Sequence, residues 1–84
     1  MEVLLKKIED WRQRVLQIKA LLDIDGKQVK ERELRLKMSA PDFWSDQTQA
    51  VKVSKEVEEL ADEINTWEKI GLEIRELEEM IALT

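Results

Sequence analysis

Residues 39–46 of the chain read Ser-Ala-Pro-Asp-Phe-Trp-Ser-Asp, and this is the one segment where a helix must stop. Pro41 has no amide hydrogen to donate, and it disfavours the helical conformation at Ala40. Ser45 or Asp46 is a suitable N-cap for a helix that follows. The segment therefore predicts a turn between two helical stretches.

Phe43 and Trp44 lie in the middle of this break, and they are too apolar for a free loop tip. We expect them to fold back and plug one end of a helical bundle. Trp44 has two interpretations, since it either completes the core or is presented to a partner. Phe43 and Trp44 are therefore the candidate partner-contact residues.

Downstream of the break, apolar residues recur at alternating intervals of three and four: Ala50, Val53, Val57, Leu60, Ile64, Trp67, Gly71 and Ile74. This spacing predicts one helix over residues 47–83. The stripe then shifts, because Leu77 and Ile81 continue it but Glu78 does not. Gly71 on the stripe either allows close approach of a neighbour or weakens the helix.

Upstream of the break, two further segments have helical periodicity. Residues 2–22 carry an uninterrupted stripe at Leu4, Ile8, Trp11, Val15, Ile18 and Leu22. Residues 24–39 carry a weaker apolar stripe. A helix formed by these residues therefore needs packing from its neighbours to be stable. Asp23 or Asp25 suits a new helix start, which places a boundary near Asp23. The alternative is one long helix through Gly26, at a cost of about 1 kcal/mol relative to Ala.

These segments predict an all-α fold, an antiparallel, coiled-coil-like three-helix bundle over residues 1–84 as a single domain. The third helix would be about 55 Å long, at 1.5 Å per residue, and would span the two shorter helices lined up end to end. We expect its core to be built from the following residues: Leu4, Ile8, Trp11, Val15, Ile18, Leu22, Val57, Leu60, Ile64, Trp67 and Ile74.

The composition excludes several kinds of chemistry. The chain of 84 residues has no Cys and no His, which rules out a thiol nucleophile, a His-based triad and a zinc site with Cys or His ligands. Acidic pairs such as Glu59 and Glu63 lie one turn apart, but a catalytic pair would need a concave pocket that raises one pKa. We favour a solvated helix face, and we expect no catalytic residue, no metal, no cofactor and no enzymatic activity.

Charge is divided unevenly along the chain. Residues 1–40 hold ten basic and seven acidic groups, whereas residues 41–84 hold four basic and twelve acidic groups. A basic run lies in the second helix: Lys27, Lys30, Arg32, Arg35 and Lys37. Because Glu31 and Glu33 interleave it, we favour charge pairing within the bundle over contact with ribosomal RNA or an acidic protein. There is no direct nucleic-acid motif.

No membrane partner is expected, because apolar runs such as Val3-Leu4-Leu5 are far too short to span a bilayer. No signal peptide is visible either. Without Cys the redox compartment is unconstrained, and a cytoplasmic location is the default expectation.

The break segments resemble a known family. Residues 22–25, Glu33-Leu34, residues 41–46, Ala50 and Glu56 occur in the order and spacing of the N-terminal domain of bacterial class I peptide chain release factors, type 2. The Pro-Asp-Phe-Trp-Ser-Asp segment is the most specific part. Glu31 departs from the family pattern, which usually has an aliphatic residue there.

The resemblance implies an accessory, ribosome-docking helical domain at the N-terminus of a longer protein that terminates translation at stop codons. It implies the ribosome near the stalk base, and the GTPase-type release factor, as partners. The family's catalytic Gly-Gly-Gln motif and codon-reading Ser-Pro-Phe tripeptide do not occur in these 84 residues. The rival interpretation is a generic coiled-coil scaffold that dimerises through its apolar stripes, and a homodimer of the chain is compatible with both.

Overall fold

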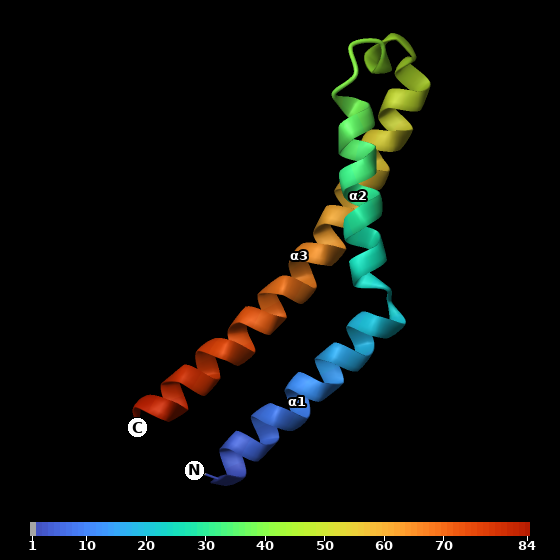
Figure 1. The fold of residues 1–84 in the computed structure, drawn as a ribbon. Coiled ribbons are helices and arrows are strands. Elements are labelled where there is room, and N and C mark those ends of the chain that lie inside the picture. Colours follow the sequence, from blue (N-terminus) through green and yellow to red (C-terminus); the bar gives the residue numbers. More distant parts are fainter. Residues whose placement is uncertain (1) are drawn as a thin grey trace. The chain divides into compact units, whose positions relative to one another are not determined.

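The computed structural model describes residues 2–84 as three α-helices and one short 3-10 turn (Figure 1). Helix α1 covers Glu2–Leu21, α2 covers Ile24–Met38, η1 covers Phe43–Ser45 and α3 covers Gln47–Leu83. No strand occurs within the described residues. The predicted all-α fold with a long third helix is confirmed, and each helix begins and ends within one residue of the predicted bounds.

A tight break separates α1 from α2, so the alternative of one continuous helix through Gly26 is wrong. Asp23 adopts a positive φ of 52°, which Asp tolerates better than most residues with a side chain. The Leu22 amide still donates to the Ile18 carbonyl at 2.9 Å, and the Asp23 amide donates to that of Ala20 at 3.1 Å. The left-handed residue therefore ends α1 in the way that a C-terminal glycine usually does.

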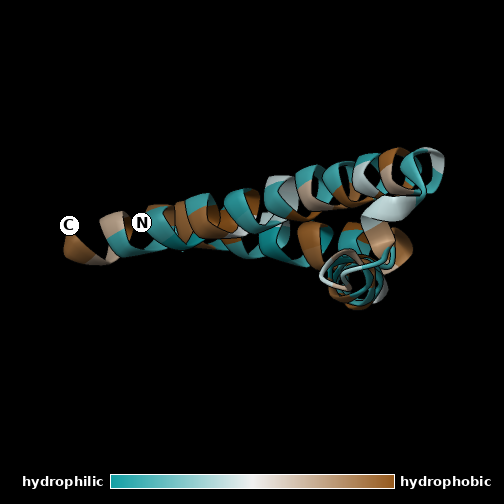
Figure 2. Ribbon diagram, turned by 90° about the horizontal axis from the view of Figure 1, so that it is seen from above, coloured by the Kyte–Doolittle hydropathy of each residue, from teal (hydrophilic) through white to brown (hydrophobic). Residues whose placement is uncertain are grey.

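The chain forms two compact units, and residues 24–64 make up the second. Here α2 runs antiparallel to the first half of α3 (Figure 1). Leu34, Val53 and Val57 are buried at the centre of this unit, with three partly buried residues packed against them, namely Met38, Phe43 and Leu60. Apolar and polar segments alternate along α1 and the C-terminal part of α3 (Figure 2), as expected for helices that bury one stripe.

The first unit joins residues 1–23 to residues 65–84. In it α1 runs antiparallel to the C-terminal part of α3, and the two helices lie side by side in both ribbon views (Figures 1 and 2). Ile8 of α1 and Ile74 of α3 are buried between them. This unit is thus a helical hairpin with a narrow apolar seam.

Three residues expected in the core are instead substantially exposed, at 52% for Leu4, 49% for Trp11 and 40% for Ile18. These residues are seven apart and so lie on the same side of α1. Within this unit α1 has one neighbouring helix, which covers the side of Ile8 and leaves the flank of Trp11 open. Expecting these three residues in a closed core was therefore wrong.

The remaining predicted core residues lie along the seams of the two units. Ile8, Val57, Ile64 and Ile74 are buried. Four others are partly buried, namely Val15, Leu22, Leu60 and Trp67. The most deeply buried side chain is one outside the predicted set, Ile24, which is 1% exposed.

Candidate functional site

The break between α2 and α3 is held by local hydrogen bonds. Ser39 Oγ donates to the Leu36 carbonyl at 2.6 Å, which satisfies an acceptor at the end of α2. Asp46 caps α3, because its Oδ1 accepts from the Gln49 amide at 3.2 Å. The short η1 turn lies between these caps, and it fixes the backbone of both candidate contact residues.

Phe43 and Trp44 have different environments within this turn. Phe43 is partly buried and packs against the core of Leu34, Val53 and Val57. Trp44 is 56% exposed, and its Nε1 donates to the Met38 carbonyl at 3.2 Å. The two rings meet edge to face, with centroids 5.0 Å apart and planes at 87°, a favourable arrangement for an aromatic pair. Phe43 is therefore the anchor, and Trp44 is a positioned but accessible indole.

The basic run on α2 is largely engaged within the second unit. Lys27 Nζ lies 2.8 Å from Glu63 Oε1, and Lys30 Nζ lies 2.8 Å from Glu56 Oε1. The hydrogen bond to Glu56, reinforced by its negative charge, raises the pKa of Lys30 above its ordinary value of 10.5. Basic α2 and acidic α3 are thus complementary where they pair, which favours the structural interpretation of this run over a phosphate-binding one.

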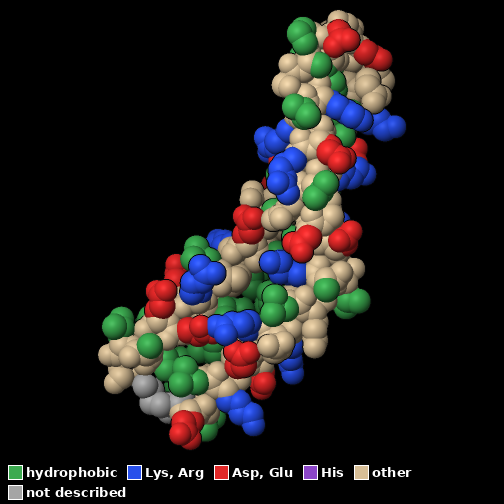
Figure 3. Space-filling model, viewed as in Figure 1, with side chains coloured by type: hydrophobic (Ala, Val, Ile, Leu, Met, Phe, Trp, Pro, Cys, Tyr) green, Lys and Arg blue, Asp and Glu red, His purple; other side chains and the backbone are tan. Residues whose placement is uncertain are grey.

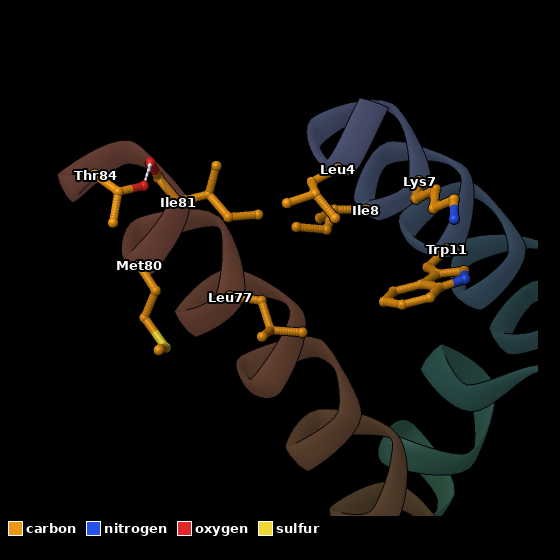
Figure 4. A pocket seen from close by; sticks show the side chains of 8 residues that line it. All are labelled: Leu4, Lys7, Ile8, Trp11, Leu77, Met80, Ile81 and Thr84. Carbon is orange, nitrogen blue, oxygen red and sulfur yellow. Dashed lines mark hydrogen bonds between the residues drawn. The ribbon is translucent and has the colours of Figure 1, made fainter. Parts of the chain in front are cut away.

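A second candidate surface lies in the first unit, where a hollow of about 440 Å³ opens between α1 and α3. Its apolar lining comes from both helices, from Leu4, Ile8, Trp11, Leu77, Met80 and Ile81. Figure 4 shows Leu4, Ile8 and Trp11 of α1 pointing toward α3 across the opening. Figure 3 shows hydrophobic side chains between the two helices of this unit, bordered by charged ones.

The acidic residues do not gather into a site that could hold a metal ion, as far as residues 2–84 are concerned. Glu63, one member of the acidic pair considered above, is engaged by Lys27. None of the helices within the same residues is long and apolar enough to span a bilayer.

These features define an all-α helical segment, and comparison with known proteins shows what this segment is similar to. Over 78 residues, or 93% of the chain, it is 32% identical to "Peptide chain release factor 2" of Petrotoga mobilis. Over 72 residues, or 86% of the chain, it is 28% identical to "Peptide chain release factor 2" of Staphylococcus haemolyticus. The resemblance seen in the break segments is confirmed.

The chain spans about a fifth of the length of these relatives, 21% of the first and 19% of the second. No protein-family model matches the chain. No solved structure matches it. The likeness therefore concerns one helical portion of a much longer protein.

Sequence reasoning identified the break but missed the apolar hollow of the first unit. The relevant signal was the shift of the stripe after Ile74, where Leu77 and Ile81 remain apolar although Glu78 interrupts them. Met80 lies outside the heptad stripe and gave no signal, yet it lines the hollow.

Proposed function

We propose that the chain is the accessory, ribosome-docking helical domain of a peptide chain release factor, active in translation termination at stop codons. The observation that carries this proposal is the similarity to release factor 2 over 93% of the chain. In this proposal the chain is the N-terminal domain of a longer protein, in the cytoplasm. Codon reading and peptidyl-tRNA hydrolysis belong to other parts of that protein, so the domain contributes binding and no catalysis.

The partners in this proposal are the ribosome near its stalk base and the GTPase-type release factor. Trp44 is the residue we expect to make contact, together with the exposed surface of α3. Two features support Trp44: its indole is fixed by the bond to Met38 and by the ring of Phe43, and more than half of it remains exposed. A rigid aromatic side chain held in this way loses little entropy on binding and is typical of interface hot spots.

Co-sedimentation with bacterial ribosomes tests this assignment. We expect the wild-type chain to pellet with ribosomes and Trp44→Ala to weaken the binding by about tenfold or more, the effect of losing a hot-spot aromatic residue. Trp11→Ala is the matched control, because Trp11 is similarly exposed but lies in the other unit. Equal weakening by both variants, or no wild-type binding, would contradict the proposal.

A second candidate function is a coiled-coil dimerisation module, which does not exclude the first. The specific observation in its favour is the open flank of α1, where Leu4, Trp11 and Ile18 are 40–52% exposed. Sedimentation equilibrium distinguishes a 9.9 kDa monomer from a dimer of twice that mass.

A further inference from the structure

The two sides of the helical hairpin in the first unit differ in character. One side carries the apolar hollow that is lined by Trp11 and Leu77. The other side is crossed by the ion pair between Arg12 and Glu78. It also holds a mixed polar and apolar hollow of about 310 Å³, whose lining includes Leu16. One face of this hairpin is therefore apolar, and the opposite face carries charged side chains and an ion pair.

A two-helix layer with one apolar face is stable when that face packs against another layer. Helices of about twenty residues are about 30 Å long, and two of them side by side are about 20 Å wide. The face thus covers about 600 Å², close to the roughly 800 Å² per partner of a standard protein interface. Its size fits a second helical hairpin.

The charges of the hairpin indicate which partner fits the apolar face and how that partner is oriented. Helix α1 carries five basic and three acidic residues, whereas residues 65–84 carry five acidic and two basic ones. A two-fold axis parallel to the helices places α1 of each copy over α3 of the other, so that basic faces acidic. An axis perpendicular to the helices would instead place each helix over its own like-charged counterpart.

We infer that the apolar face of the first unit binds a second copy of this chain, with α1 of each protomer packed on α3 of its partner. Residues seven apart lie on the same side of a helix. Arg14 therefore lies on the side of Lys7, at the α1 border of the face, and Glu73 lies on the side of Met80, at the α3 border. Since Arg12 pairs with Glu78 within one protomer, Arg14 and Glu73 lie at similar heights along the hairpin. In the dimer they oppose each other across the interface. This inference rests on the second candidate function and is independent of ribosome docking.

Sedimentation equilibrium on matched leucine variants tests the surface. Leu4 and Leu16 lie on the same helix and are both 52% exposed, but only Leu4 lines the apolar hollow. We expect a wild-type mass of twice 9.9 kDa, a monomer for Leu4→Glu, and a dimer for Leu16→Glu. Far-UV circular dichroism should show that all three chains keep their helix content.

A charge exchange tests the orientation without altering the apolar face. Arg14→Glu should raise the dimer dissociation constant by about tenfold, which corresponds to about 1.4 kcal/mol. Adding Glu73→Arg to the Arg14→Glu variant should return the dimer dissociation constant to the wild-type value. A monomeric wild-type chain, equal dissociation of Leu4→Glu and Leu16→Glu, or no recovery in the double variant would overturn the inference. The co-sedimentation test compares Trp44→Ala with the wild-type chain, and Trp44 lies in the other unit, so its outcome is separable from these results.

Discussion

Glu31 occupies a position on α2 that an apolar residue would ordinarily fill. Residues 24, 27, 31, 34 and 38 alternate by three and four along the helix, and the first and fourth of these are the buried Ile24 and Leu34. The Glu31 side chain is only 15% exposed, and it is held by Arg35 one turn later. A carboxylate on the seam gains less from burial than an aliphatic side chain, since its charge must be desolvated.

We predict that Glu31→Leu raises the free energy of unfolding by about 1 kcal/mol, because it replaces a largely buried charge with apolar surface. Urea unfolding followed by circular dichroism measures the change. Glu33→Leu is the control, since Glu33 is exposed on the same helix and its replacement should stay within about 0.5 kcal/mol. If Glu31→Leu destabilises the chain, the seam of α2 does not pack as described.

Exposure of single residues was only partly predictable from the sequence. The three-four spacing identified Ile8, Val57, Ile64 and Ile74, all of which are buried. The same spacing placed Trp11 in the core, although Trp11 is exposed. The spacing shows which side of a helix is apolar, but it does not show how many neighbouring helices cover that side. The break residues were predicted more completely, because Pro41 acts through its own backbone and the Asp46 side chain accepts from an amide only three residues away.

At the scale of elements, α3 is the longest helix and takes part in both units. Gly71 lies within its C-terminal part, and a Cβ built at this position would meet no atom within 4 Å. No neighbour therefore approaches Gly71 closely within the described residues, which leaves the interpretation that the glycine weakens the helix. The glycine acts as a weak point in an otherwise well-formed helix.

Gly71→Ala should raise the free energy of unfolding by about 1 kcal/mol, which is the helix-propensity difference between the two residues. The thermal unfolding midpoint, measured by circular dichroism, reports this change. A decrease in the midpoint would mean that the backbone at Gly71 is approached closely in solution, and the interpretation as a weak point would then be wrong.

The bounds of the helices were predictable because they depend on local chemistry at the two breaks. The left-handed conformation of Asp23 was not predictable, since Asp at that position equally suits an N-cap of the following helix. The structure shows that Asp23 ends α1 with a φ of 52°. Local sequence therefore located this boundary without revealing its geometry.

At the scale of the whole chain, the uneven division of charge has a structural explanation. Three ion pairs join a basic short helix to the acidic long helix. They are Lys27–Glu63, Lys30–Glu56 and Arg12–Glu78. This charge pairing was predicted from the composition alone. That the long helix pairs with both shorter helices was also predicted from its length, whereas the partners in each ion pair required the structure.

The similarity to release factor 2 supports our proposal that the chain supplies binding surfaces to a longer protein. It covers a fifth of those relatives, and the Gly-Gly-Gln motif of the family does not occur in it. In our account, the domain docks a longer protein on the ribosome, and its chemistry lies elsewhere in that protein.

Competition with intact release factor 2 for bacterial ribosomes tests this account most directly. Fluorescence anisotropy of labelled release factor 2 bound to ribosomes would be followed while the chain is added in excess. We predict that the anisotropy falls toward the value of the free factor, and that Trp44→Ala requires a higher concentration for the same effect. If the anisotropy is unchanged at concentrations where the chain itself pellets with ribosomes, the chain does not occupy the site of a release factor domain, and the central claim is contradicted.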